Sequence, residues 1–363
     1  MSTARAAFLT APSTIEIRDV PLPDDLGDGA LLRVEACGLC GSDVEQFHGG
    51  TREAGKVVVP GHEPLGVIDR ISPAAAERWG VAVGDRVVPE IVVPCGACRR
   101  CDAGETTSCE RSLGSYGYRP FPSPTELVGG FADYMYLHPN TVVHRMNPDI
   151  PAELAAMFNP IAAGIRWGVQ LGGAGTGDTV LVLGAGQRGI AAAMAVKSAG
   201  AARVIMTGLA SDAHKLALAR DFGVDDTIVV DDDVDVPERV RALTDGAMAD
   251  VVLELTPMAA QPVRDAIDAA RVGGTVVLAG LKGHRPIELV TDRIIQKGLR
   301  LVGALGVDST SVREAIRLVE SGVYPLERLH THTYGVDEVG TALRVLAGEV
   351  AGEEPVHVAV VPA

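Results

Sequence analysis

Four of the six cysteines in this 363-residue chain lie in one short segment, at Cys95, Cys98, Cys101 and Cys109. In a reducing compartment, cysteines clustered at such spacing indicate metal binding rather than disulfides. Four thiolates can close a tetrahedron around zinc and leave no coordination position open, which is typical of a structural site. Short runs of this kind also hold iron–sulfur clusters, but no proline follows the last cysteine and the sequence has no second set of four. The spacing therefore predicts structural zinc.

A second set of candidate ligands lies in the segments CGLCGSD (37–43) and GHE (61–63). The Cys40 thiolate, the His62 imidazole and the Glu63 carboxylate are ligand types that zinc accepts, and three protein ligands leave one position open for water or substrate. Zinc in such a site polarises a bound oxygen. These residues predict a catalytic zinc site, although a cysteine beside glycine and a single histidine often have no ligand role.

A glycine-rich loop, Gly184-Ala185-Gly186-Gln187-Arg188-Gly189, follows the apolar run 179–183 and precedes an alanine-rich helical stretch. In this strand–turn–helix setting, glycines permit a tight turn and bring the pyrophosphate of a dinucleotide to the helix N-terminus. Gly208 stands where an acidic residue would bind the ribose of NAD. Ser211, His214 and Lys215 are candidate donors to the 2′-phosphate of NADP, whereas Asp212 could reach a ribose. NAD and NADP therefore both stay open.

Two kinds of architecture must position these residues. Before residue 150, short runs rich in β-branched residues alternate with glycine and proline, as at 30–36, 64–71 and 85–88. From about residue 153, helical stretches alternate with apolar runs at 179–183, 203–206, 227–230, 251–255, 276–279 and 301–302. Buried strands that alternate with helices indicate a parallel sheet covered on both faces. We further expect helices at 311–321 and 337–347, a closing strand at 356–361, and a solvated loop at the acidic run 231–235.

Composition limits the class of protein. Hydrophobic residues make up 47% of the chain, which excludes disorder and allows two domains to bury cores. The formal net charge of −15 repels phosphate backbones and anionic lipid, so we expect no nucleic-acid partner and no membrane partner. No apolar run approaches the roughly 20 residues of a membrane helix, and the first residues carry no apolar leader segment. We therefore expect a cytoplasmic protein.

The motifs CGxCGSD, GHE, the four-cysteine segment, GxGxxG and AMADVVLEL (247–255) follow one another along essentially the whole chain. In this order they resemble the zinc-containing medium-chain alcohol/polyol dehydrogenases. The resemblance implies an α/β protein: a GroES-like β-rich catalytic domain at 1–155 with a structural zinc lobe at 95–109, a Rossmann domain with a doubly wound parallel sheet at 156–305, and a return to the catalytic domain at 306–363. It also implies two zinc ions per subunit, one catalytic and one structural, NAD(P) as cofactor, and a homo-oligomer, either dimer or tetramer.

The resemblance implies a role for each matching residue. Cys40 and His62 match the thiolate and imidazole ligands of the catalytic zinc, and Glu63 matches a glutamate that is a ligand in some members and a partner of the ligands in others. Ser42 matches the hydroxyl that takes the proton of the substrate, and Asp43 matches the carboxylate that orients the zinc-bound histidine. Gly184, Gly186, Gln187, Arg188, Gly189, Gly208, Ser211 and Lys215 form the expected cofactor site, and the loop 116–121 is expected to line the substrate pocket.

The chain departs from the family at two positions. Asn159, within Phe158-Asn159-Pro160-Ile161, stands where the family carries Glu, Asp or Cys as a further ligand, and Glu45 stands where a histidine often passes the proton to solvent. Because an amide oxygen is a weak zinc ligand, we expect Cys40, His62 and Glu63 to hold the metal, with Asn159 bound weakly or hydrogen-bonded to zinc-bound water. Glu45, His48 or the cofactor ribose would end the proton relay.

The expected activity is reversible hydride transfer between an alcohol, with a secondary alcohol or polyol favoured, and NAD(P), with zinc as Lewis acid. Two alternatives come from other classes. A zinc-binding regulatory member without catalysis is motivated by Asn159 and predicts one tightly bound zinc and no turnover. A zinc-independent quinone or enoyl reductase on the same fold is disfavoured, because such proteins generally lack both cysteine sets.

Overall fold

The computed structural model describes residues 2–50 and 56–362, and these residues form two compact units. The first unit contains residues 1–158 and 330–363, and the second contains residues 159–329. The chain therefore leaves the first unit once and returns to it with its last segment. Each unit has its own sheet and is described by itself.

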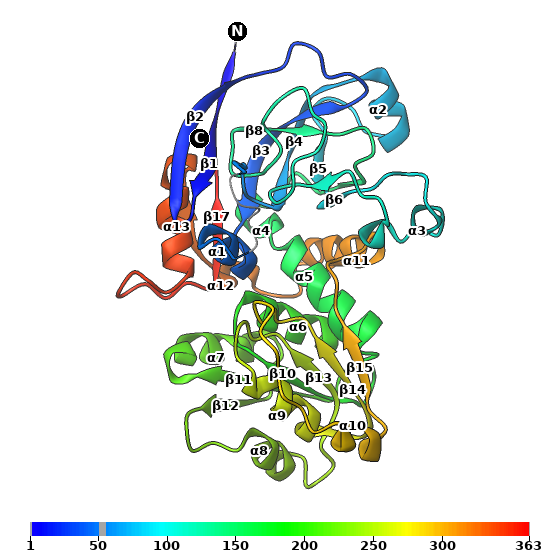
Figure 1. Cartoon of the computed structure of the whole chain (residues 1–363), viewed down its shortest axis with the longest axis vertical. Helices are drawn as coiled ribbons and strands as arrows, with labels where there is room; N and C mark the ends of the chain where they lie inside the picture. Colours follow the sequence, from blue (N-terminus) through cyan, green and yellow to red (C-terminus); the bar gives the residue numbers. More distant parts are fainter. Residues whose placement is uncertain (1, 51–55, 363) are drawn as a thin grey trace. The chain divides into compact units, whose positions relative to one another are not determined.

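The first unit is built on a mostly antiparallel sheet (Figure 1). Its strand order is β16-β17-β3-β4-β5-β9, and β8 pairs with β3 beside this path. The bounds are β3 (Ala30–Gly38), β4 (Glu63–Ile71), β5 (Arg86–Pro89), β8 (Tyr134–Leu137), β9 (Val143–Arg145), β16 (His330–Tyr334) and β17 (His357–Val360). A separate hairpin pairs β1 (Thr3–Ala11) with β2 (Thr14–Pro21). Buried side chains such as Leu31, Leu32 and Ile68 pack on this sheet and form one of the cores of the unit.

The pairing of β3 with β4 brings the two candidate ligand segments together. Gly38 at the end of β3 is opposite Glu63 at the start of β4. Cys40 follows β3 by two residues and caps the N-terminus of α1 (Gly41–Phe47), whereas His62 directly precedes β4. Residues that are 22 positions apart in sequence therefore lie at the same end of one strand pair.

The remaining elements of this unit are short. The four-cysteine lobe contains β6 (Val92–Val93), α3 (Arg99–Asp102) and β7 (Gly114–Ser115), and β6 pairs with β7. The other helices are α2 (Pro73–Trp79), α4 (Ala152–Ala155) and α13 (Val339–Leu346).

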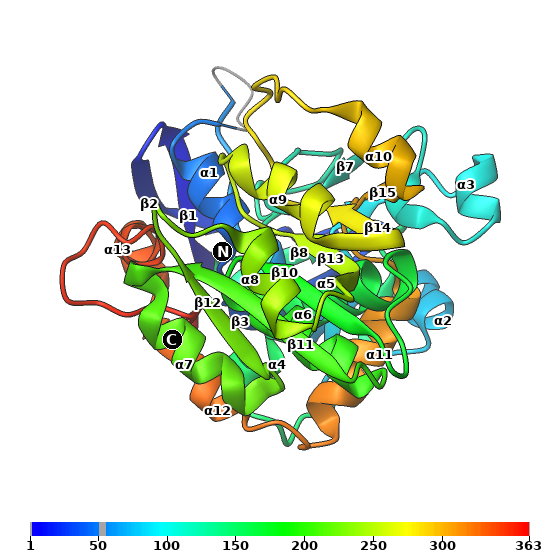
Figure 2. The ribbon, with the colours of Figure 1, turned by 90° about the horizontal axis from the view of Figure 1, so that it is seen from below.

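The second unit is a doubly wound Rossmann sheet, and Figure 2 shows its strands side by side. The strand order β12-β11-β10-β13-β14-β15 reverses direction between β10 and β13, and every pair is parallel. Such a reversal opens a crevice at the carboxyl ends of the strands, where ligands bind. The strands are β10 (Thr179–Leu183), β11 (Arg203–Leu209), β12 (Asp226–Val230), β13 (Ala249–Glu254), β14 (Ala270–Leu278) and β15 (Arg300–Gly303).

Helices cover this sheet and bury its apolar strands. Val236 and Val240 of α8 (Val236–Leu243) and Ala266 of α9 (Gln261–Ala269) pack with strand residues such as Leu181 and Ile205 in one core. The other helices are α5 (Phe158–Gly164), which continues into a π-helical segment at Ile165–Leu171, α6 (Gln187–Ser198), α7 (Ala213–Ala219), α10 (Thr291–Lys297), α11 (Ser309–Glu320) and α12 (Leu326–Leu329).

The return to the first unit lies at residue 330, whereas the sequence led us to expect it at 306. The physical reason is that the segment before α11 is tied to the π-helical segment. Trp167 Nε1 donates to the Gly306 carbonyl oxygen at 3.0 Å, and Arg166 forms an ion pair with Asp308 at 2.8 Å. The helix α11 is therefore part of the second unit.

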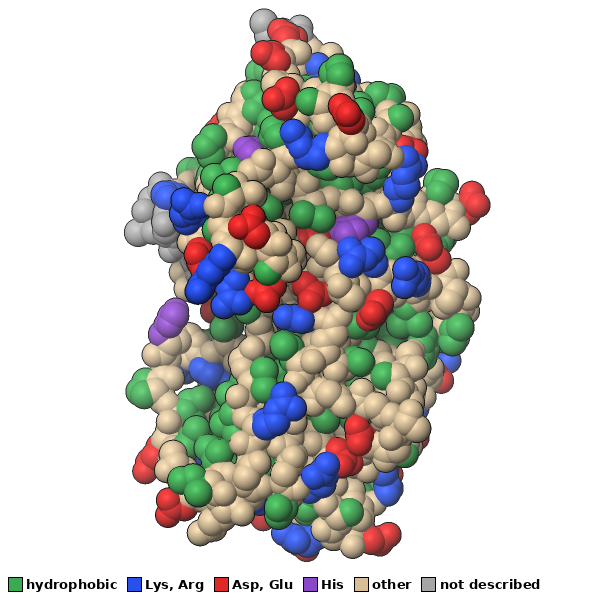
Figure 3. All heavy atoms as spheres, turned by 90° about the vertical axis from the view of Figure 1, so that its right-hand side faces the viewer, with side chains coloured by type: hydrophobic (Ala, Val, Ile, Leu, Met, Phe, Trp, Pro, Cys, Tyr) green, Lys and Arg blue, Asp and Glu red, His purple; other side chains and the backbone are tan. Residues whose placement is uncertain are grey.

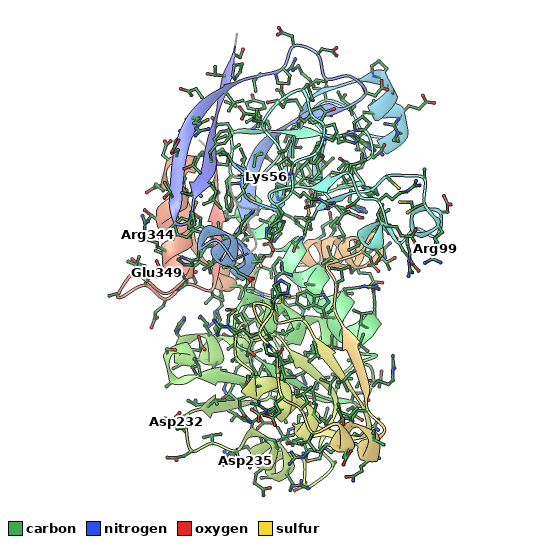
Figure 4. The ribbon with its side chains drawn as sticks, viewed as in Figure 1. Lys56, Arg99, Asp232, Asp235, Arg344 and Glu349 are labelled. Atoms are coloured by element: carbon green, nitrogen blue, oxygen red, sulfur yellow. The ribbon has the colours of Figure 1, made fainter. Side chains whose placement is uncertain are left out.

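The surface carries charges of both signs. On the face that Figure 3 shows, acidic and basic side chains are interspersed. The acidic run before α8 is a solvated loop, in which Asp232 is exposed and Asp235 accepts a hydrogen bond from the Glu238 backbone N–H at 2.9 Å (Figure 4). Among the residues that the structure describes, no helix has the length and apolar character to cross a membrane.

Candidate active site

Three candidate ligands converge in the first unit. One ligand atom each from Cys40, His62 and Glu63 lies within 4.8 Å of the other two, and all three side chains are buried. His62 Nε2 is 3.6 Å from Glu63 Oε1. A thiolate, an imidazole and a carboxylate at this spacing suit a zinc ion and leave a coordination position for substrate.

The Asp43 carboxylate is within hydrogen-bond distance of two of these ligand residues. Its Oδ2 accepts the backbone N–H of Cys40 at 2.9 Å, and its Oδ1 lies 3.0 Å from His62 Nδ1. Because Nδ1 is bonded to this carboxylate, Nε2 is the nitrogen that can bind a metal. The position that the resemblance implies for Asp43 therefore has the matching geometry.

The electrostatics of this cluster favour a cation. Burial of His62 lowers its pKa, but the charge of Asp43, hydrogen bonds with Asp43 and Cys40, and the charge of Glu63 outweigh burial and raise the pKa to about 10. The negative charges around His62 therefore stabilise a positive charge in this buried site. A zinc ion bound there would be stabilised by the same charges, so the residues present fit the metal.

Two hydroxyl groups adjoin the metal ligands. Ser42 Oγ lies 2.6 Å from Tyr118 Oη, which is 3.3 Å from His62 Nε2. The rings of Tyr118 and His62 are tilted, with their centroids 4.7 Å apart. The sequence indicated only that the loop 116–121 lines the pocket, because the contact joins residues 76 positions apart without a local motif.

The loop that carries Tyr118 is fixed against the ligand segment. A Cβ at Gly117 would lie 2.7 Å from the Gly61 carbonyl oxygen, so only glycine allows this close approach. Gln46 Nε2 of α1 donates to the Gly117 carbonyl oxygen at 2.9 Å. His48, a candidate end of the relay, is exposed and forms a pair with Glu349 at 3.0 Å (Figure 4 labels Glu349).

The four cysteines of the lobe also come together. Their sulfur atoms all lie within 4.8 Å of one another, with Cys98–Cys101 at 3.6 Å, Cys98–Cys109 at 3.9 Å and Cys95–Cys101 at 4.0 Å. A Zn–S bond of about 2.3 Å gives a tetrahedron with edges of about 3.8 Å. Backbone N–H groups, that of Cys101 first, lower the pKa of Cys98 to about 6, whereas burial first of all raises the pKa of Cys101 to about 11, so Cys98 is the first of the two to become a thiolate. Arg99 beside it points into solvent (Figure 4).

The glycine-rich loop of the second unit joins β10 to α6 as the sequence predicts. Gly184 has φ +115°, and a Cβ at Gly189 would lie 2.0 Å from the Gly184 carbonyl oxygen. Gly186 is the exposed N-cap of α6, so the first backbone N–H groups of this helix can face an anion.

The end of β11 lacks the acidic residue expected for NAD. Gly208 lies there, and Asp212 in the following turn is bonded to the Leu209 N–H at 3.1 Å and to Lys215 Nζ at 2.8 Å. Ser211 lies in the same turn. The Asp212 carboxylate and the Lys215 ammonium group therefore compensate each other's charge in the turn that follows β11.

Asn159 is buried in the second unit, where its Oδ1 accepts a hydrogen bond from Arg188 Nη2 at 3.1 Å. We expected this oxygen to bind zinc weakly or to contact zinc-bound water. The structure shows a hydrogen bond with Arg188 that the sequence did not indicate, and the expected role of Asn159 at the metal stays a prediction.

Comparisons with known proteins cover both units. The alcohol dehydrogenase GroES-like domain matches residues 27–148, and the zinc-binding dehydrogenase domain matches residues 189–321. A probable alcohol dehydrogenase of Mycobacterium tuberculosis is 43% identical over 99% of both chains, and an erythritol/L-threitol dehydrogenase of Mycolicibacterium smegmatis is 32% identical over 99% of this chain and 98% of its own. A zinc-binding dehydrogenase from Sinorhizobium meliloti, solved with NADP, is 27% identical, with a TM-score of 0.84 and full coverage of both chains.

The fold and these relatives together define a two-unit zinc-binding dehydrogenase. The chain belongs to the zinc-containing medium-chain alcohol dehydrogenase family. It is an NAD(P)-dependent oxidoreductase that interconverts alcohols and carbonyl compounds, and the expectation of a catalytic rather than a regulatory member is confirmed.

Proposed function

We propose that this protein oxidises a secondary alcohol or polyol with a catalytic zinc held by Cys40, His62 and Glu63. The observation that carries the proposal is the buried convergence of these ligands, with Asp43 behind them and the Ser42–Tyr118 hydroxyl pair next to them. A second, structural zinc at the four cysteines completes two ions per subunit. The polyol preference is supported by the relative that acts on erythritol and L-threitol.

When bound, zinc supplies Lewis acidity and the nicotinamide accepts the hydride. The residues of the chain handle the proton. The Ser42 hydroxyl takes the proton of the substrate alcohol as its own proton passes to Tyr118 Oη, 2.6 Å away, and Tyr118 in turn releases its hydroxyl proton toward the end of the relay at Glu45, His48 or the cofactor ribose. Asp43 keeps the His62 Nδ1 proton in place, so that the imidazole ring stays in its ligand orientation throughout turnover.

We also propose that the cofactor site admits a 2′-phosphate. Gly208 has no carboxylate to repel the 2′-phosphate, and Lys215 offsets the charge of Asp212. The relative solved with NADP supports this assignment. Because the proposed zinc sites need reduced cysteines, we place the protein in the cytoplasm.

We further propose a homo-oligomer, dimer or tetramer. It is supported by the edge strand β15, where Leu301 and, in the following residues, Leu305 are exposed, and by Ile295 of α10, which is 74% exposed. An exposed apolar strand edge is a ready surface for pairing with a second copy. Light scattering of the purified protein tests this, and a monomer would contradict it.

The enzymatic proposal is tested by assaying primary alcohols, secondary alcohols, polyols and aldehydes with NAD and NADP separately. Ser42→Ala should lower turnover by about 10²-fold, within the range for general acid–base groups, with unchanged zinc content. Ser321→Ala, which removes an exposed hydroxyl at the end of α11, is the control. Near wild-type turnover of Ser42→Ala, with hydride transfer rate-limiting, would contradict the proton route.

A further inference from the structure

A buried ion pair lies at the carboxyl end of the central strands of the second unit. Glu254, the last residue of β13, is fully buried, and its Oε1 lies 2.9 Å from Lys282 Nζ. The Thr256 backbone N–H also donates to Glu254 Oε1, at 3.0 Å. Glu254 Oε2 is buried and has no hydrogen-bond partner among the residues that the structure describes. Within this part of the chain, Lys282 therefore supplies the positive charge that compensates the carboxylate.

Lys282 also ties the loop that follows β13 to its own loop, which follows β14. Its Nζ donates to the Thr256 carbonyl oxygen in the loop after β13. Close by, the Met258 backbone N–H donates to the Leu281 carbonyl oxygen at 2.8 Å. A Cβ at Gly280 would lie 2.2 Å from the Thr256 carbonyl oxygen, so only glycine allows the loops to approach this closely. The two loops therefore pack directly on each other.

One residue of these loops has an unusual backbone conformation. Met258 has φ +63°, in the left-handed region that residues other than glycine rarely adopt. Such a conformation persists only where the surroundings fix it, and it is found most often at binding and catalytic sites. The contacts between the loops supply this constraint, and the strained position indicates a functional role for the loops.

The loops lie at the end of the sheet where a Rossmann fold binds its dinucleotide. The strand order reverses between β10 and β13, and the glycine-rich loop after β10 is placed to bind the pyrophosphate. The end of β11, on one side of β10, is the position for the adenosine ribose, whereas β13 pairs with the other side of β10 (Figure 1). Thr256 adjoins the glycine-rich loop, since a Cβ at Gly184 would lie 3.3 Å from Thr256 Cγ2. The nicotinamide half of the dinucleotide therefore extends toward the loops after β13 and β14.

Stability alone does not account for a buried pair of this kind. The cost of taking two charges out of water can exceed their attraction, so an apolar pair of similar volume is often as stable. An ion pair adds direction, because the Lys282 ammonium group must meet Glu254 Oε1 and the Thr256 carbonyl oxygen at the same time. This requirement fixes the path of both loops.

We propose that Glu254 and Lys282 are positioning residues for the nicotinamide half of the cofactor. The pair holds the loops 255–258 and 279–283 in the conformation that binds this half, and Glu254 acts through Lys282. The proposal rests on the NAD(P) dependence of the protein and is independent of which residues bind zinc.

The test compares each dinucleotide with the matching ligand that lacks nicotinamide. Isothermal titration calorimetry of the zinc-loaded protein gives dissociation constants for NADH and ADP-ribose, and for NADPH and 2′-phospho-ADP-ribose. The variants are Lys282→Met, Glu254→Gln and the double variant. Arg271→Met is the matched control, because Arg271 of β14 pairs with Asp250 of β13 at 2.5 Å, at the amino ends of the same two strands.

We expect Lys282→Met to raise the dissociation constant of the dinucleotide about tenfold, because binding must then order both loops. The dissociation constant of the nicotinamide-free ligand should change by less than about twofold, as should both constants of Arg271→Met. Glu254→Gln should weaken dinucleotide binding no more than Lys282→Met does, and the double variant should equal Lys282→Met, because one residue acts through the other. The double variant removes both buried charges, so it carries the comparison if Lys282→Met, with its uncompensated carboxylate, does not fold.

Equal losses of affinity for the dinucleotide and for its nicotinamide-free counterpart would overturn the proposal, because the pair would then support the second unit as a whole. Wild-type dinucleotide binding by the double variant, or an equal loss in Arg271→Met, would also overturn it. A wild-type protein that binds neither NADH nor NADPH would refute the NAD(P) dependence itself, and this outcome is recognised before any variant is compared.

Discussion

Asp43→Asn should weaken the catalytic zinc site while leaving all its ligands in place. The Asp43 carboxylate serves two buried groups, the Cys40 N–H at 2.9 Å and His62 Nδ1 at 3.0 Å. An asparagine has a single acceptor oxygen, so one of these donors would face an NH₂ group instead. Loss of such a carboxylate partner typically costs 10- to 100-fold in metal affinity, or about 1.4 to 2.7 kcal/mol. Because Asp43 and His62 are both buried and two contacts are involved, we expect the upper end.

The assay is dialysis of zinc-loaded protein against increasing EDTA, followed by elemental analysis. Wild type and Asp43→Asn should both keep the zinc of the four-cysteine lobe, and the variant should lose its second zinc at about 100-fold lower chelator concentration. Asp69→Asn is the control, because Asp69 is partly exposed and lies 3.9 Å from Arg70. If Asp43→Asn released each zinc ion at the same EDTA concentration as the wild-type protein, the reasoning that Asp43 holds the ligands would be refuted.

Three further predictions concern the ligands and the pH dependence of stability. Glu63→Gln should remove the catalytic zinc and leave the lobe's zinc; full zinc content in this variant would contradict Glu63 as a ligand. Cys101→Ser should reduce zinc to one ion per subunit and lower the melting temperature of the protein, with reduced-cofactor binding by the second unit retained; two ions by elemental analysis would exclude the lobe site. Burial, and then the charge of His330, lower the pKa of His357 to about 3, so the folded state binds fewer protons than the unfolded state between about pH 6.5 and 3. The free energy of unfolding should therefore fall by about 2 kcal/mol from pH 7.5 to pH 5 through this residue, and urea titrations of His357→Gln should show a correspondingly flatter dependence, whereas an unchanged slope would contradict it.

Much of the second unit could be predicted because its signals are local. The apolar run 179–183 coincides with β10. The run 251–255 overlaps β13 (Ala249–Glu254) and ends one residue beyond it. Both are continuous buried strands, for which hydrophobicity alone is a sufficient signal. The cysteine spacing of the lobe is equally local, since four ligands within fifteen residues need only a short loop to converge.

The boundary of the second unit and the hydroxyl pair of the site could not be predicted in this way. The helix at Ser309–Glu320 has an ordinary amphipathic pattern, and only the Trp167–Gly306 contact, across 139 positions, shows which unit it joins. Ser42 and Tyr118 meet because Gly117 allows the loop to approach Gly61 closely. Such contacts depend on packing between distant segments, which no local pattern encodes.

Asn159 shows how a change of ligand type can leave the charge at a metal balanced. Resemblance alone placed a neutral amide where the family carries an anionic ligand, which would leave one more positive charge at the zinc. The structure gives the amide oxygen to Arg188 and brings Glu63 to the ligand cluster. A Cys40 thiolate and a Glu63 carboxylate together match the charge of one divalent ion, and neutral His62 adds none. The proposed centre therefore needs no carboxylate at position 159.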